Sequence, residues 1–125
     1  MSGCATSHPP TPPPGPHARG VLETEEGFAS YYGPGLHGKV AANGQPFNMN
    51  ALVAAHPAYP FGTVVRVTNL KNGRSVQLRI VDRGPTAGPR STGVIIDVSR
   101  RAAQALALIE DGRARVRVEV LRWGG

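Results

Sequence analysis

Carboxylates are scarce in this chain, and Asp82 is the one whose position best suits chemistry. Asp82 ends the run 76–82, whose alternating apolar residues are typical of a strand. Side chains two residues apart share one face of a strand, so Asp82 shares the face of Leu78 and Ile80. We therefore expect Asp82, directly before a Gly-Pro turn, at the mouth of the fold rather than in bulk water. Partial desolvation at such a mouth raises the pKa of a carboxyl group, which suits a general acid.

Asp82 and a second carboxylate, Asp97, each have a structural interpretation as well. An Asp before a Gly-Pro turn commonly accepts backbone N–H groups, and spacing alone favours this capping role for Asp82. The second candidate, Asp97, precedes Ser99 at the start of an expected helix. We interpret Asp97 as structural, because a carboxylate there caps the helix or complements its dipole.

Histidine supplies the other titratable candidates. His56 follows the short apolar run 52–55 and is expected at the same mouth, where a His can orient a catalytic carboxylate or tune its pKa. A hydrogen-bonded structural His is the commoner outcome. His37 lies far from His56 in the sequence, and two such residues without a third ligand do not predict a metal site. We expect neither a metal nor another cofactor.

The segments that must position these residues are short and mostly extended. Alternating or continuous apolar runs predict strands at 28–32, 52–55, 63–69, 75–82, 94–98 and 116–120. Asn72-Gly73 predicts a hairpin, since both residues tolerate positive φ. Ser99 can cap one helix that runs to about Asp111. The last strand alternates valines with Arg115, Arg117 and Glu119. These elements predict a mainly β fold, a small closed barrel of six strands with one short inserted α-helix.

Composition sets the domain organisation. The chain has 125 residues and 12 prolines, and six of the prolines lie between Pro9 and Pro16. Such a stretch cannot pack, so we expect residues 1–26 to be a Pro-rich N-terminal tether and residues 27–125 to form one barrel domain. No run approaches the roughly 20 apolar residues of a membrane span. One cysteine excludes an internal disulfide and a Cys-rich zinc site.

The basic charge does not indicate a nucleic-acid partner. The net charge is +6, but the arginines are scattered and match no nucleic-acid motif. A solvated Arg-rich surface is the simpler interpretation, and an anionic polysaccharide remains open as a partner. A nucleic-acid-binding barrel is favoured by charge alone, and we expect no nucleic acid to bind.

Several strings in order carry a family resemblance, namely GFASYYGPGLHGK, AANGQPFNMNALVAAH, YPFGTVVRVTNLKNGRSV, RIVDRGP and VIIDVSRRAA. The chain resembles the rare lipoprotein A family of septal lytic transglycosylases, from Gly27 to about Leu121. The resemblance implies a double-psi β-barrel that cleaves peptidoglycan glycan strands between N-acetylmuramic acid and N-acetylglucosamine and leaves a 1,6-anhydro end. It also implies that Asp82 is the catalytic acid and base. One carboxyl suffices, because the muramic 6-hydroxyl is an internal nucleophile.

The resemblance also implies a glycan-binding groove. We expect His56 to join Asp82 as a catalytic residue. The residues expected to bind substrate are Gln45, Asn48, Tyr31, Tyr32, Phe47, Tyr59 and Arg83. Aromatic rings are included because they stack on the apolar faces of sugars. The family usually has Glu at the position of Gln45 and often Asp at that of Asn48. These two departures favour the alternative, a non-catalytic, expansin-like glycan-binding or wall-loosening barrel.

The N-terminus suggests where the domain works. Ser2-Gly3-Cys4 is similar to the end of a lipobox, which implies lipidation of Cys4. We therefore expect a monomer in the cell envelope, periplasmic and anchored to the outer membrane as a lipoprotein. Its partners are expected to be peptidoglycan glycan strands, with contact to the membrane only through the lipid.

Overall fold

The computed structural model describes residues 20–125. Cys4, with the rest of residues 1–19 of the expected tether, lies outside the described residues. Six strands are present in this range: β1 (Glu23–Tyr31), β2 (Val53–Ala55), β3 (Val64–Asn69), β4 (Ser75–Asp82), β5 (Val94–Val98) and β6 (Ala114–Arg122). Three short helical segments accompany them: the 3-10 turn η2 (Pro34–Leu36) and the helices α1 (Ala87–Ser91) and α2 (Arg100–Ala105).

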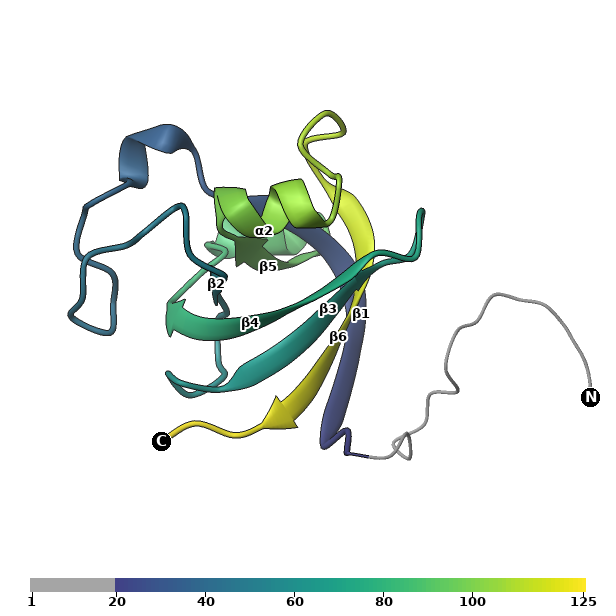
Figure 1. Ribbon diagram of the computed structural model, residues 1–125, viewed down its shortest axis with the longest axis horizontal. Coiled ribbons are helices and arrows are strands. Elements are labelled where there is room, and N and C mark those ends of the chain that lie inside the picture. The colour runs from purple at the N-terminus through teal and green to yellow at the C-terminus, as the bar shows by residue number, and fades with distance from the viewer. Residues whose placement is uncertain (1–19) are drawn as a thin grey trace, which may run out of the picture.

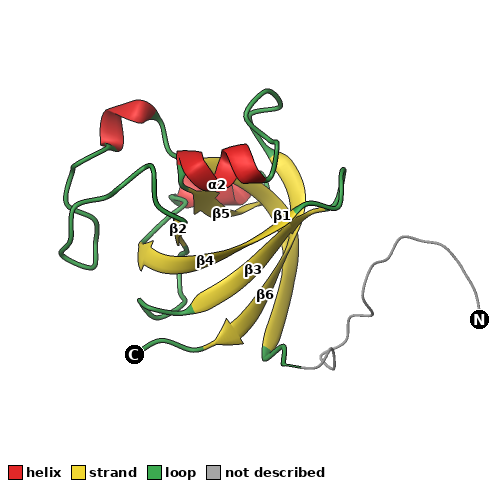
Figure 2. Cartoon of the chain, viewed as in Figure 1, coloured by secondary structure: helices red, strands yellow, loops and turns green. Residues whose placement is uncertain are grey.

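The strands close into a barrel in the order β1-β5-β2-β4-β3-β6 (Figures 1 and 2). β1 runs parallel to β5 and β2 runs parallel to β4, while the other neighbours are antiparallel. α2 lies across one end of the barrel, and the long loop between β1 and β2 extends away from its side (Figure 1). The predicted mainly β, six-stranded barrel is confirmed.

The interior of the barrel is filled from all six strands. Most of its fully buried members are small or β-branched residues such as Val65, Ile80, Ile96 and Val118, with Leu78 among the larger ones. These stiff side chains fit a pleated surface, which explains why such short runs form strands. A second cluster joins Val53 and Val81 to Ala41 and Phe47 and fastens the loop between β1 and β2 to the outside of the barrel.

The folded domain begins before the expected boundary between residues 26 and 27. β1 starts at Glu23, and its first four residues pair with β6 in antiparallel register. Val21 is already buried. The three glutamates of this segment carry no apolar alternation, so composition alone assigned them to the tether. Pairing with β6 places them on the barrel.

β6 is more buried than its alternation predicts. Arg117 and Glu119 are only 8% and 3% exposed, although they alternate with the core valines. Closure of the barrel puts Glu26 directly opposite Arg117 and Arg66 directly opposite Glu119. Each pair forms an ion pair, with N–O distances of 3.1 and 3.0 Å respectively. The neighbouring strands therefore cover both charges.

The helices differ from the expected single one. Ser99 caps α2 as predicted by accepting the N–H of Ala102, but the helix ends at Ala105 rather than near residue 111. Ala107 has a positive φ of 56°, which an α-helix does not accommodate. α1 is a second helix that the sequence did not predict. Within residues 20–125, no helix has the length and apolar character that a membrane crossing needs.

The predicted hairpin joins β3 to β4. Only Gly73 has a positive φ there, and its N–H donates to the Asn69 carbonyl over 2.8 Å.

Candidate active site

A cleft of about 360 Å³ lies beside the end of β4, and Asp82 lines it. The Asp82 carboxylate accepts three hydrogen bonds. Tyr32 donates its hydroxyl to Oδ2 over 2.7 Å, and the backbone N–H groups of Ala42 and Arg83 donate to Oδ1 over 2.8 and 2.9 Å. Asp82 therefore holds the turn through backbone N–H groups and also faces the cleft.

Asp97 faces the same cleft, and the helix-capping role expected of it is not observed. Ser99 alone caps α2, whereas the hydroxyl of Ser30 donates to Asp97 Oδ1. The parallel pairing of β1 and β5 sets Ser30 beside Asp97, and the antiparallel pairing of β2 and β5 sets Ala55 on its other side. The apolar run 94–98 is interrupted only by this acid, and that interruption was the signal available in the sequence.

The surroundings of Asp97 favour its protonated form. Burial raises the pKa of its carboxyl above the ordinary value, the Ser30 hydrogen bond partly opposes that rise, and the negative charge of Asp82 adds to it. Gly84 passes close to the second oxygen: a Cβ there would meet Asp97 Oδ2 at 3.4 Å. Gly84 also has a φ of +144°, which side chains rarely adopt, so glycine leaves this oxygen room.

Tyr32 is positioned from behind by Phe47. Their rings stack with centroids 4.1 Å apart and an interplanar angle of 16°. Burial and the hydrogen bond to Asp82 raise the pKa of Tyr32, so its hydroxyl remains a donor. Phe47 is only 3% exposed and supports Tyr32. Tyr31 lines the cleft as expected, with its body packed against the barrel core.

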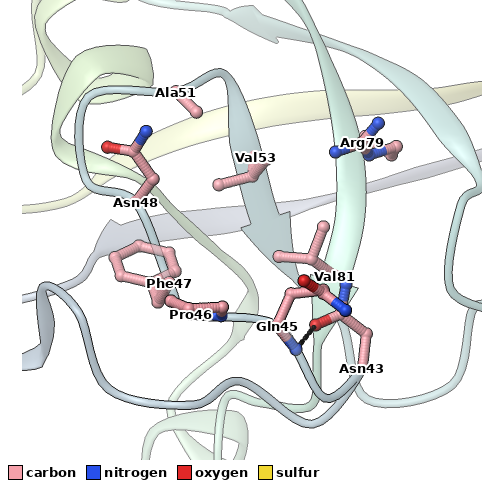
Figure 3. A pocket seen from close by; sticks show the side chains of 9 residues that line it. All are labelled: Asn43, Gln45, Pro46, Phe47, Asn48, Ala51, Val53, Arg79 and Val81. Atoms are coloured by element: carbon pink, nitrogen blue, oxygen red, sulfur yellow. Dashed lines mark hydrogen bonds between the residues drawn. The ribbon is translucent and has the colours of Figure 1, made fainter.

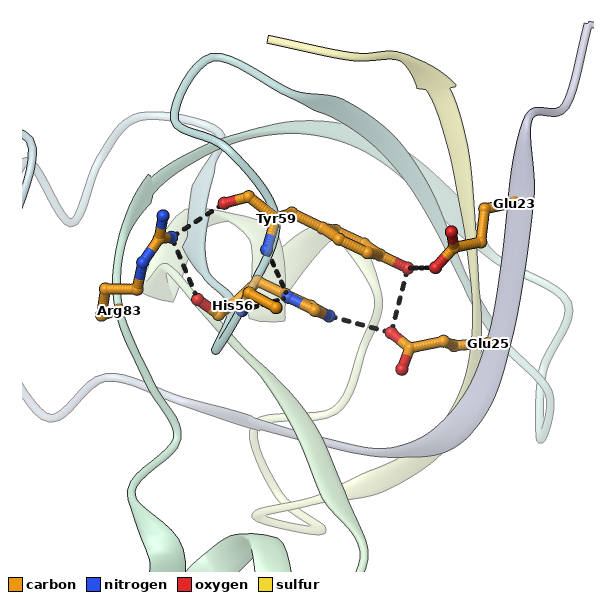
Figure 4. A network of polar contacts seen from close by, with 6 residues as sticks. Glu23, Glu25, His56, Tyr59 and Arg83 are labelled. Atoms are coloured by element: carbon orange, nitrogen blue, oxygen red, sulfur yellow. Dashed lines mark hydrogen bonds and ion pairs between the residues drawn. The ribbon is translucent and has the colours of Figure 1, made fainter. Parts of the chain in front are cut away.

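The polar partners of the His56 ring are Glu25, Ala58 and Tyr59, and Asp82 is not one of them. His56 is 4% exposed, and its Nε2 lies 2.8 Å from Glu25 Oε1 (Figure 4). Nδ1 accepts the backbone N–H groups of Ala58 and Tyr59, each over 3.0 Å, so the ring proton is on Nε2 and His56 donates to Glu25. The predicted catalytic role of His56 is therefore corrected to a positioning role, in which its backbone N–H donates to the Asp82 carbonyl over 3.2 Å.

Tyr59 belongs to the His56 network rather than to a sugar-binding surface. It is 5% exposed, and its ring stacks on His56 with centroids 3.5 Å apart. Its hydroxyl lies 3.1 Å from carboxylate oxygens of both Glu23 and Glu25 (Figure 4). The predicted substrate contact of Tyr59 is wrong, because β1 begins early enough to bring these glutamates over the ring.

Arg83 lines the Asp82 cleft, but its guanidinium is already engaged. Nη1 donates to the carbonyls of Tyr59 and His56 over 2.8 and 3.3 Å (Figure 4). The guanidinium also lies over the ring of Phe61, 4.1 Å from its centroid. Arg83 thus ties the end of β4 to the loop that follows β2.

Gln45 and Asn48 do not line the Asp82 cleft. Both belong to a second pocket of about 210 Å³, which the loop between β1 and β2 forms against β2 and β4 (Figure 3). Phe47 lines this second pocket, whereas its stacking partner Tyr32 lines the Asp82 cleft. The two sites therefore meet at the Tyr32–Phe47 stack. Among residues 20–125, no three His, Cys, Asp or Glu side chains gather where they could hold a metal ion.

Comparison with known proteins identifies the family. The family model described as "Lytic transglycolase" matches residues 24–118. The chain belongs to this family. Its fold is the double-psi β-barrel, so the resemblance drawn from the sequence is confirmed.

Similar curated proteins carry transglycosylase names. The chain is 49% identical over 104 residues to the endolytic peptidoglycan transglycosylase RlpA of Campylobacter jejuni, which is 83% of this chain and 36% of that protein. It is 48% identical over 96 residues to the protein of the same name from Neisseria meningitidis serogroup A, which is 77% of this chain and 38% of that protein. The chain thus spans a little over a third of the length of these relatives.

Solved structures share the fold at low sequence identity. Streptomyces papain inhibitor superposes with a TM-score of 0.64 at 22% identity, covering 82% of this chain and 97% of the inhibitor. An expansin of Clavibacter michiganensis superposes with a TM-score of 0.62 at 21% identity, covering 82% of this chain and 52% of the expansin.

Proposed function

We propose that this barrel is a lytic transglycosylase domain that cleaves peptidoglycan glycan strands between N-acetylmuramic acid and N-acetylglucosamine and leaves 1,6-anhydro ends. The observation that carries the proposal is the pair of carboxylates in one cleft, Asp97 and Asp82, which have unlike surroundings. Pairs of acidic groups whose environments differ supply the acid and the charge-stabilising partner in glycosidic bond cleavage. The names of the curated relatives support the same activity.

In this mechanism Asp97 is the acid, in place of Asp82, to which the resemblance assigned that role. Its raised pKa keeps the carboxyl protonated to higher pH than an ordinary aspartic acid, so Asp97 donates its proton to the glycosidic oxygen. The bond between that oxygen and the anomeric carbon of muramic acid breaks, and positive charge develops on the sugar ring. Asp82 accepts three hydrogen bonds and is fixed in place, so its oxygens can stabilise that charge.

The 6-hydroxyl of the same muramic acid then completes the reaction. Its oxygen bonds to the anomeric carbon and closes the 1,6-anhydro ring, and its proton passes to the Asp97 carboxylate. Asp97 is thereby restored, and neither water nor a cofactor enters the balance. An internal nucleophile of this kind is already held close to its target, which is why no residue is needed to position a water molecule.

Incubation of the protein with peptide-free glycan strands tests the proposal. Mass spectrometry should detect products with 1,6-anhydromuramic ends, and hydrolysis in place of ring closure would contradict the mechanism. Binding of the strands without any cleavage would instead support the glycan-binding alternative.

We also propose that the domain works in the cell envelope, where its substrate lies, with Cys4 lipidated. The closed barrel offers no unpaired strand edge among the described residues, which supports a monomer. Metabolic labelling with a fatty acid should mark the wild type and not the Cys4→Ala variant, and light scattering should report the mass of one chain.

A further inference from the structure

The second pocket has a chemistry different from that of the Asp82 cleft. Its floor is apolar, formed by Val53 of β2 and Val81 of β4 (Figure 3). Its polar side chains come from Asn43, Gln45 and Asn48 of the loop and from Arg79 of β4. None of its lining residues is an acid, so the pocket presents no negatively charged side chain to a ligand.

Two of the amides are oriented by the loop itself. The side-chain oxygen of Asn43 accepts the Gln45 N–H over 3.0 Å, and that of Asn48 accepts the Asn50 N–H over 2.9 Å. These bonds identify which amide atom is the oxygen, because only an oxygen accepts. The NH₂ groups of Asn43 and Asn48 are therefore left as donors to a ligand.

Arg79 adds a positive charge to these donors. It is exposed, and within residues 20–125 it forms no ion pair. A guanidinium pairs well with a carboxylate because its N–H groups match the two carboxylate oxygens. A pocket of donors with one cation, no acid and an apolar floor favours a carboxylate attached to an apolar carbon.

We propose that this pocket is an accessory subsite that binds a carboxylate carried by the substituent of a muramic acid residue. The proposal rests on the proposed function, because muramic acid is the sugar of that substrate that carries such a group. The Tyr32–Phe47 stack joins the two sites, so one glycan strand can reach both. The carboxylate belongs either to the free lactyl group of peptide-free glycan or to a stem peptide, and these sources share the same chemistry.

Calorimetry measures the affinity of ligands for the full chain and distinguishes the lactyl carboxylate from that of a stem peptide. The Asp97→Asn substitution serves as the background, so that the ligand is not cleaved. Three ligands are compared: a peptide-free muramic-acid-containing tetrasaccharide, its lactyl methyl ester, and the same tetrasaccharide with stem peptides. A charge-assisted hydrogen bond at a partly exposed site gives a preference of about tenfold for the acid over the ester.

Arg79→Gln should abolish that preference and leave the affinity for the ester unchanged. Arg74→Gln, an exposed arginine outside the pocket, is the matched control and should keep the preference.

Each outcome decides the proposal. A preference for the free acid that depends on Arg79 assigns the lactyl group, and a preference for the peptide-bearing strand that depends on Arg79 assigns the stem peptide. Equal affinity for all three ligands, no binding of any, or a preference that survives Arg79→Gln overturns the subsite. Asn48→Asp is a second test that retains the bond to Asn50, and the added charge should weaken binding of the acid and not of the ester.

The subsite and the proposed function can fail separately. Anhydro products from the wild type without an Arg79-dependent preference would retain the function and remove the subsite. An Arg79-dependent preference without anhydro products would retain the subsite and remove the function.

Discussion

Replacement of Asp97 by Asn tests the catalytic assignment most directly. Asn has the same shape, and its oxygen can still accept the Ser30 hydroxyl, so the change removes the transferable proton and little else. Oδ2 is the oxygen near Gly84, where an amide NH₂ faces the cleft. Loss of a general acid lowers the rate roughly a hundredfold to ten-thousandfold, or about 3 to 5 kcal/mol of transition-state stabilisation.

The assay is the initial rate of anhydro-product formation from peptide-free glycan strands, measured by mass spectrometry for wild type and variant. Asp111→Asn is the matched control, because Asp111 is exposed and its one ion pair within residues 20–125 is with Lys71 on the surface. The control should keep the wild-type rate. An Asp97→Asn variant that retains its rate within about threefold would refute the assignment of Asp97 as the acid.

The same variant makes a prediction about stability. The pKa of Asp97 is raised on folding, so the folded state binds its proton more tightly than the unfolded state, whose carboxyl has an ordinary pKa near 3.8. The free energy of unfolding of the wild type therefore falls as pH rises from the unfolded pKa through the folded pKa. Asp97→Asn removes this cost and should raise the melting temperature at pH 7 relative to wild type, with a smaller difference at pH 3. Wild-type activity should also fall as Asp97 ionises.

Three further predictions concern neighbouring groups. Asp82→Asn should abolish anhydro-product formation while glycan binding, measured by pull-down, persists; an active variant would contradict the role given to Asp82. Tyr32→Phe removes the hydrogen bond to Asp82 but keeps the stack on Phe47, so the rate should fall about tenfold with the melting temperature unchanged. The His56 hydrogen bond lowers the pKa of Glu25, so this carboxylate stabilises the fold above its ordinary pKa of 4.5, and that stabilisation is lost as pH falls through the lowered pKa. Glu25→Gln should lower the melting temperature at pH 7 and have little effect at pH 2, and equal effects at both pH values would contradict the pairing.

Local patterns in the sequence predicted much of the fold. Five of the six strands were predicted within about two residues of their observed ends, since alternation of β-branched residues depends only on which face of a strand is buried. The start of β1 could not be predicted this way, because Glu23, Glu25 and Glu26 bond to partners far along the chain rather than to a buried face. The cap at Ser99 is a local interaction and was predicted correctly.

The sequence by itself determined the family, the six-stranded barrel and the presence of Asp82 at the end of an apolar strand. Only the tertiary structure decided which side chains share a cleft. Ser30 meets Asp97, 67 positions away, through the pairing of β1 with β5. The His56 ring meets Glu25, 31 positions away, rather than Asp82, through a side-chain contact across the closed barrel. Local spacing can place a side chain on a face, but barrel closure decides which faces meet. The burial that raises the pKa of Asp97 exists only after that closure.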